Sequence, residues 1–327
     1  MQFHVLPDHM DVAGYVSTFG FMAQGILLIF FNLPVLIFAT ISTKQRLYYG
    51  VLIMSLLNGL IIGIVSIGYS VFRLIINSQG RSSDTVLVHM CFYNPITFLL
   101  LWTFPMNGLS LLMIAVDRFM VVAYPLLYFR SSKTIVILIN IAALIINASL
   151  MAFTIIYTLM ENARYQQVNI LCNQNQFLSL TLYVIVAGCR TLFSVLFITV
   201  MLIVLLCLRW QHHLKVKQAF QTEVEMQKFA KRQMEFTKTM LFSCAATLFL
   251  FILPSTFAII AQIYALDTKG DIATWTRLVT FFNSFNIAIL VLYRQRDIRR
   301  RMFFAVKRVT FGKILHLKAS VIPSTTG

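Results

Sequence analysis

Two charged residues stand next to each other, Asp117 and Arg118, where a long charge-free stretch of the sequence ends. No Asp, Glu, Lys or Arg precedes them as far back as Asp84. A carboxylate and a guanidinium form strong charge-assisted hydrogen bonds, and the guanidinium can exchange this partner for an acceptor on another protein. On its own, such a pair is also typical of a charged anchor at a membrane surface.

Arg190 is the second candidate, because it interrupts an apolar stretch over 178–208. An ionisable residue inside such a stretch is by default a functional hypothesis. We expect Arg190 to contact a ligand that has an anionic or hydrogen-bond-accepting group, with Arg73 and Arg277 adding positive charge near the same end of the molecule. The alternative is that Arg190 bonds to backbone carbonyls or reaches Glu161 and contacts no ligand.

Four further residues could line the same ligand site, and all lie on the stretch that ends at the Asp-Arg pair. Aromatic and Met side chains at such spacing are also typical of packing between helices. These four candidates are Phe98, Trp102, Met106 and Asn107.

Residue patterns of enzyme chemistry are missing from the sequence. His212 and His213 are adjacent, which is not the spacing of a metal-binding pair, and there is no Gly-rich phosphate loop or Ser-His-Asp set. We therefore expect no catalytic activity, no metal and no cofactor.

The amino-acid composition indicates that the helices which position these candidate residues belong to a membrane protein. Of 327 residues, 59% are hydrophobic and only 12% are charged, whereas a soluble domain has roughly 25% charged residues. So few charges cannot cover the surface of a water-soluble globule.

The apolar stretches are long enough for membrane-spanning helices, which need about 20 residues each. Two stretches, near 178–208 and 272–293, contain one Arg each, and five others contain no charge. We predict an all-α integral membrane bundle of seven helices over 15–293, with an extracellular N-terminus over 1–14 and a cytosolic tail over 294–327. The charge-free stretches run from Asp11 to Lys44, Arg46 to Arg73, Asp84 to Asp117, Lys133 to Glu161 and Lys238 to Asp267.

Lys and Arg are concentrated in alternate loops, which the positive-inside rule places in the cytosol. The other loops contain only Arg81, Arg164 and Lys269, apart from the Arg residues at span ends. We therefore predict a multi-pass plasma membrane protein with its N-terminus outside and its C-terminus inside. The lipid bilayer explains the formal net charge of +16, so we expect no nucleic-acid partner.

Two cysteines, Cys91 and Cys172, are predicted to lie on the outer side of the membrane, where disulfides persist. The other three cysteines fall within predicted spans. A Cys91–Cys172 disulfide would tie the second outer loop to the top of the third helix; the alternative is that both thiols stay reduced.

Several motifs together resemble the rhodopsin-like G-protein-coupled receptors, and the resemblance covers nearly the whole chain. Its most specific part is "DRFMVVAYPLLY", where the family commonly has Asp-Arg-Tyr followed by Pro-Leu-x-Tyr at the same spacing. Pro254 in "FLFILP" matches the kink proline of the sixth helix, and "NSFNIAIL", which contains Asn286, is similar to the Asn-Ser run of the seventh. Short loops and degenerate motifs make the chain most similar to the chemosensory serpentine receptors of nematodes.

The sequence also departs from the family pattern. Phe119 replaces the usual Tyr, Ile252 stands where a Trp is common, and no Pro follows Asn286. The second span has Asn58 near the position of the usual sodium-binding Asp.

The resemblance implies a receptor that binds an extracellular small molecule and activates a heterotrimeric G protein. It implies that Arg118 pairs with Asp117 at rest and meets the G protein on activation, while Glu235 is a candidate second partner. Pro254 would supply the bend of the sixth helix. Other residues of the inner switch are Phe119, Pro125, Leu126, Tyr128 and Asn286, of which we expect Leu126 and Tyr128, with Leu127, on an exposed cytosolic turn.

The segment after Tyr293 places apolar residues on one helical face and basic residues largely on the other, which predicts a short amphipathic helix on the inner membrane surface. The apolar face comprises Ile298, Met302, Ala305, Val306 and Val309.

A transporter or a ligand-gated channel for a small solute is the alternative function. The sequence has no internal symmetry of the kind that transporters show, and no amphipathic pore-lining span stands out.

Overall fold

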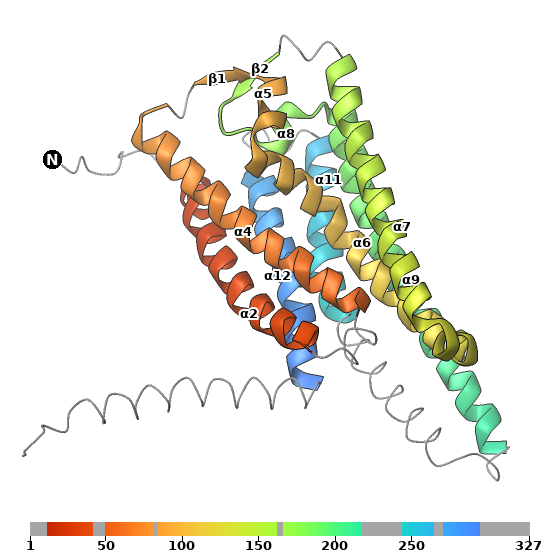
Figure 1. Cartoon of the computed structure of the whole chain (residues 1–327). Helices are drawn as coiled ribbons and strands as arrows, with labels where there is room; N and C mark the ends of the chain where they lie inside the picture. The colour runs from red at the N-terminus through yellow and green to blue at the C-terminus, as the bar shows by residue number, and fades with distance from the viewer. Residues whose placement is uncertain are drawn as a thin grey trace, which may run out of the picture.

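Long helices lying side by side form almost all of the structure, a computed structural model that describes residues 12–41, 50–81, 84–161, 166–217, 244–264 and 271–294 (Figure 1). Within these residues, six helices are long and apolar enough to cross a membrane. The protein is therefore an all-α, multi-pass membrane protein, as the composition predicted. The six candidate spans are Thr18–Thr40, Gly50–Ser78, Pro95–Ala123, Arg130–Met160, Leu180–Trp210 and Cys244–Ile263.

The first three candidate spans are formed in chain order by α2, α4 and α6, with two short elements before α2 and two before α6. The elements of this part are α1 (Val12–Tyr15), the π-helix η1 (Val16–Gly20), α2 (Phe21–Ile41), α4 (Gly50–Ser78), β1 (Thr85–Leu87), α5 (Val88–Tyr93) and α6 (Pro95–Ala123).

The second part of the chain supplies the remaining candidate spans and one more long helix. Its elements are α7 (Pro125–Met160), β2 (Gln167–Asn169), α8 (Gln174–Phe177), α9 (Leu180–Lys217), the π-helix η3 (Leu248–Ile252), α11 (Leu253–Ile263) and α12 (Asp271–Arg294). The helix α12 covers the seventh predicted span and packs against α2 and α11, but it is not among the six candidate spans.

The third predicted span begins later than expected, because Cys91 lies in α5 and not in α6. Asn94 separates the two helices in an extended conformation, with φ −73° and ψ 113°. A residue before proline avoids the helical region, so Pro95 imposes this break. The Asn94 side chain then accepts a hydrogen bond from the Ile96 N–H at 3.0 Å and caps α6.

The second proline of this region ends α6 and begins α7. Tyr124 leaves the helical conformation, with φ −130° and ψ 61°, and Pro125 occupies the first turn of α7. Proline is well tolerated there, since the first N–H groups of a helix have no partner within it. The expected cytosolic turn is therefore the start of a helix, which bends again at Ser131.

A small antiparallel sheet covers one end of the bundle, close to α5 and α8 (Figure 1). Strand β1 pairs with β2 in the register Thr85 with Asn169, Val86 with Val168 and Leu87 with Gln167. The disulfide between Cys91 and Cys172 lies just beyond these strands, with the Cα atoms 5.6 Å apart. The predicted pairing of these two cysteines is confirmed.

The segment before Pro254 is a π-helix, η3, and Pro254 lies in the first turn of α11 that follows it. A π-helical turn inside a spanning helix widens the backbone and commonly marks a functional site. The sixth candidate span thus has two adjacent irregularities, the π-helix and the proline.

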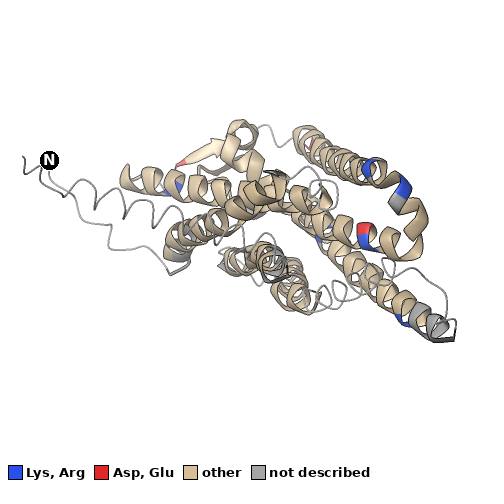
Figure 2. Cartoon of the chain, turned by 60° about the horizontal axis from the view of Figure 1, so that its bottom comes forward, with Lys and Arg blue, Asp and Glu red and all other residues tan. Residues whose placement is uncertain are grey.

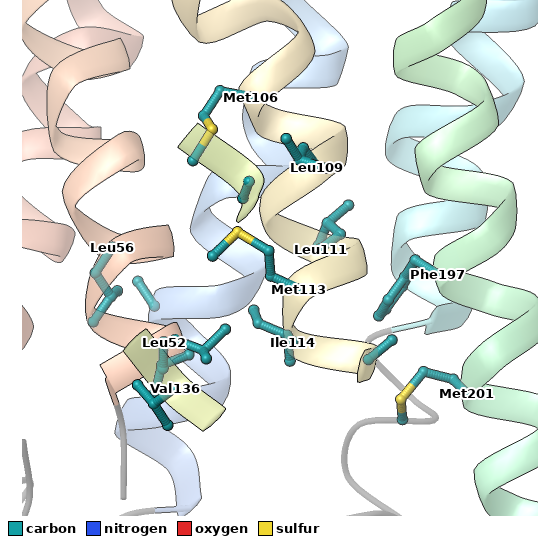
Figure 3. Close-up of a cluster of buried hydrophobic side chains, with 14 of the residues drawn as sticks. Leu52, Leu56, Met106, Leu109, Leu111, Met113, Ile114, Val136, Phe197 and Met201 are labelled. Carbon is teal, nitrogen blue, oxygen red and sulfur yellow. The ribbon is translucent and has the colours of Figure 1, made fainter. Parts of the chain in front are cut away.

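The core at mid-bundle consists mainly of apolar side chains from α4, α6, α7 and α9 (Figure 3), to which α2 and α12 add smaller ones. Met106, Leu111 and Phe197 are almost fully buried within it. Two further clusters lie around Cys91 and Leu182 and around Phe21 and Phe281. The three clusters hold the helices in one bundle.

Charged residues are few along the described helices (Figure 2). Large apolar side chains instead occupy the outward faces of α7 and α9, where Leu138, Ile145 and Leu206 are exposed. Exposed apolar faces of this extent suit contact with lipid.

Candidate functional site

The carboxylate of Asp117 is the centre of a buried polar cluster near the end of α6. Arg118 Nη2 donates a hydrogen bond to Asp117 Oδ2 at 2.5 Å. Tyr128 Oη donates another to Asp117 Oδ1 at 2.8 Å. Both carboxylate oxygens are thus engaged, and the side chain of Asp117 is only 4% exposed, against 12% for Arg118.

The turn between α6 and α7 brings Tyr128 back to Asp117. The Tyr124 N–H bonds to the Met120 carbonyl as the last helical bond of α6, and the Tyr128 N–H bonds to the Tyr124 carbonyl as α7 begins. A prediction is corrected here: Tyr128 is 7% exposed and not on an exposed turn. Its ring is buried because its hydroxyl reaches an otherwise unsatisfied carboxylate oxygen.

The neighbours of this cluster are largely exposed. Leu126 and Leu127 point outward, as predicted. The Phe119 ring meets the Tyr124 ring edge-on, with centroids 6.5 Å apart. An exposed apolar pair beside a buried charge cluster offers both an anchoring surface and a displaceable hydrogen-bond donor.

Other predicted switch residues lie apart from this cluster. Glu235 and the tail after Arg294 are outside the described residues. Asn286 is half-buried on α12, and one turn earlier Asn283 accepts a hydrogen bond from Thr247 Oγ1 at 3.0 Å. This bond links α12 to the helical turn before η3.

Arg190 is 3% exposed and contacts three other helical segments. Its Nη2 donates to Ser255 Oγ on α11 at 2.8 Å. Its guanidinium carbon lies 3.7 Å from the ring centroid of Phe104 on α6 and 5.0 Å from that of Phe251 in η3. Such cation–π contacts are favourable when desolvated. The Arg190 side chain thus contacts Ser255 and two aromatic rings, and not the backbone carbonyls or Glu161 that the alternative prediction named.

Arg190 therefore touches the sixth candidate span on both sides of Pro254. Phe251 precedes the proline in the π-helix, and Ser255 directly follows it. Neither neighbour was predicted from the sequence. The only signal in the sequence was that Ser255 is a polar residue beside a kink proline.

Two other outer arginines differ in their surroundings. Arg73 Nη1 donates to Tyr69 Oη at 3.2 Å, and Tyr69 donates to Asn173 Oδ1 at 2.7 Å. Arg277 is 8% exposed, and its side chain forms no hydrogen bond or ion pair with any residue that the structure describes.

The four predicted lining residues of α6 are all wholly or partly buried. Met106 and Asn107 are almost fully buried, and Met106 belongs to the mid-bundle core (Figure 3). Phe98 and Trp102 are partly buried and pack against the outer cluster. The residue of α6 that contacts Arg190 is Phe104, which was not predicted.

The segment between α7 and α9 is fastened at three places: by the Cys91–Cys172 disulfide, by the β1–β2 ladder and by the bond of Asn173 to Tyr69. It therefore lies fixed against α4, which carries Tyr69, and α5, which carries Cys91. Among the described residues, no group of three or more His, Cys, Asp or Glu side chains is arranged to hold a metal ion.

Comparison with known proteins gives no family to which the chain can be assigned, since no protein-family model and no curated protein matches it.

Proposed function

We propose that this protein is a G-protein-coupled receptor of the plasma membrane that binds an extracellular small molecule and activates a heterotrimeric G protein. The observation that carries the proposal is the buried cluster of Asp117, Arg118 and Tyr128. These residues belong to the motif by which the sequence resembles rhodopsin-like receptors. At one end of the helix bundle, Asp117 holds the Arg118 guanidinium in a hydrogen bond that a binding partner could replace.

The arrangement of the bundle supports the proposal. In the proposed receptor, α12 is the seventh span, because it is 24 residues long and packs against α2 and α11. The end with the disulfide and the small sheet is extracellular, where disulfides persist. The end with Asp117 faces the cytosol, together with the Lys- and Arg-rich loops of the sequence.

In the proposed resting state, Asp117 holds Arg118 while Tyr128 holds Asp117. An activating ligand binds the active arrangement of the helices more tightly than the resting one and shifts the population toward it. The lower part of the sixth span then moves about η3 and Pro254. Arg118 leaves Asp117 and bonds to the G protein.

The outer and inner sites are linked in this account through Arg190. It contacts both sides of Pro254, so a change at Arg190 alters the packing of the hinge. A coupling free energy of about 1–3 kcal/mol between two such sites is typical of allosteric proteins.

Nucleotide exchange tests the proposal directly. Purified full-length receptor in lipid nanodiscs is mixed with purified heterotrimeric G proteins and a library of small molecules. We expect at least one compound to accelerate GTP binding, and we expect an Arg118→Gln variant to lose this acceleration while it still binds the compound. Absence of exchange together with solute flux in proteoliposomes would contradict the proposal and favour a transporter or channel.

A further inference from the structure

Two buried arginines of the outer half of the bundle have no carboxylate partner among the described residues. Arg190 and Arg277 are 3% and 8% exposed, and the Nε of each is buried without a hydrogen-bond acceptor, as is the Nε of Arg73, whose side chain is only partly buried. The ion pairs of the described chain are elsewhere, at Arg81 with Asp84 and at Arg118 with Asp117. A charge inside a bundle normally pairs with an opposite charge, so these two are exceptions.

The two arginines lie near the same end of two helices, α9 and α12, that both pack against α11. Arg190 is ten residues into α9 and Arg277 six residues into α12, which places them about 15 Å and 9 Å from the outer ends of their helices. The helix α11 packs against both α9 and α12. The π-helix η3, whose Phe251 lies beside Arg190, also packs against both α9 and α12.

Ser255 on α11 adds a neutral donor to this region. Its Oγ accepts the hydrogen bond from Arg190, and its own O–H donates to no acceptor among the described residues. The unused N–H donors of the two guanidinium groups and the O–H of Ser255 suit a carboxylate, because its two oxygens accept several hydrogen bonds.

We propose that Arg190, Arg277 and Ser255 form a binding site for the carboxylate of a small organic acid. The inference names the ligand chemistry of the receptor proposed above and rests on that proposal. The carboxylate neutralises both arginines and accepts a hydrogen bond from the Ser255 O–H, and it draws the guanidinium of Arg190 away from the Phe251 ring and from the Ser255 oxygen. Binding of the acid therefore loosens the contacts of Arg190 on both sides of Pro254.

Formate and acetate are suitable probes, because they are carboxylates small enough not to depend on the shape of the rest of the ligand. Thermal unfolding of the purified full-length receptor is measured with each acid and with its neutral amide, formamide or acetamide. Ionic strength is held constant with the bulky sulfonate MES. At saturating concentrations we expect the acids to raise Tm by about 2–4 °C and the amides to leave it unchanged.

The variant Arg277→Gln should abolish the acid-induced shift, and the charge-conserving Arg277→Lys should retain part of it. Without added acid, Arg277→Gln should also have a higher Tm than the wild type, since it removes an uncompensated buried charge. The matched control is Arg73→Gln, because Arg73 already donates to Tyr69; its acid-induced shift should equal that of the wild type.

Equal shifts with acid and amide would overturn the inference, as would an unchanged acid shift in Arg277→Gln. A lower Tm of Arg277→Gln without acid would show that Arg277 has a structural role and would also overturn it. No G protein is present, so failure of this experiment leaves the nucleotide-exchange result intact. Conversely, an acid-specific shift without nucleotide exchange would refute only the receptor function.

Discussion

At the residue scale, the inner cluster depends on the Tyr128 hydroxyl. This hydroxyl and Arg118 occupy the two oxygens of Asp117, and the side chains of Asp117 and Tyr128 are buried. A hydrogen bond to a charged group contributes about 1.5–3 kcal/mol. Whatever function the cluster has, Tyr128 is the residue that keeps the carboxylate in place for Arg118.

We expect Tyr128→Phe to raise basal nucleotide exchange about tenfold. The substitution removes a bond to Asp117 that stabilises the resting state, and about 1.4 kcal/mol corresponds to a tenfold shift of a two-state equilibrium. The control is Tyr124→Phe, because Tyr124 is exposed and its hydroxyl has no role in the cluster. Equal basal rates in the two variants would contradict the assigned role of Tyr128.

The bond between Arg190 and Ser255 gives a second prediction at this scale. Ser255→Ala leaves a buried charged donor without its acceptor, so we expect unfolding stability to fall by roughly 1.5–3 kcal/mol. Thermal unfolding of the purified protein measures it. Thr256→Ala is the control, since Thr256 is exposed and its hydroxyl donates to the Ile252 carbonyl in its own chain segment. A similar loss in both variants would mean that the Arg190 contact contributes no stability.

The sequence predicts residue positions better than residue contacts. It singled out Asp117, Arg118 and Arg190, because a charge in a long apolar stretch is visible without any structure. It could not predict that Tyr128 is buried, or that Phe104, Phe251 and Ser255 surround Arg190. These contacts depend on how separate helices pack, which the spacing along one helix does not determine.

At the element scale, the close packing of α6 against α9 depends on Gly108. A Cβ at this position would lie 2.5 Å from the backbone oxygen of Arg190. Small residues permit such close approach of helices in membranes. This approach also sets the position of Arg190 relative to Phe104.

We expect Gly108→Ala to lower stability by about 1–3 kcal/mol, because the α9 backbone must shift to admit the methyl group. Gly188→Ala on α9 is the matched control, since a Cβ there meets nothing within 4 Å. That variant should be more stable by roughly 0.5–1 kcal/mol, as Ala favours the helix. Thermal unfolding of the two variants measures the difference. If Gly108→Ala is as stable as the wild type, the tight α6–α9 contact is refuted.

Proline chemistry explains most differences between predicted and observed elements. The break at Asn94 follows from Pro95, and the start of α7 follows from Pro125. Both effects are local and can be predicted from the sequence, because the residue before a proline avoids the helical conformation. The π-helix η3 has no such signal, because a widened turn depends on packing around it.

At the scale of the whole molecule, the sequence alone predicted a helical membrane protein and the disulfide that closes its outer end. The charge-free stretches predicted the helices, because a bilayer tolerates few other structures, and the expected position of Cys91 and Cys172 outside the membrane predicted the disulfide. The described helices include six candidate spans, and α12 has Asp271, Arg277 and Arg294 along its length. Whether it crosses the membrane decides on which sides the two chain ends lie.

The central claim is that the Asp117 cluster faces the cytosol and the Cys91–Cys172 disulfide faces outward, with both chain ends on opposite sides of the plasma membrane. Epitope tags at the two termini test it in intact and permeabilised cells. We predict that antibody binds the N-terminal tag in intact cells and the C-terminal tag only after permeabilisation. Detection of both tags on the same side of the membrane would contradict the account.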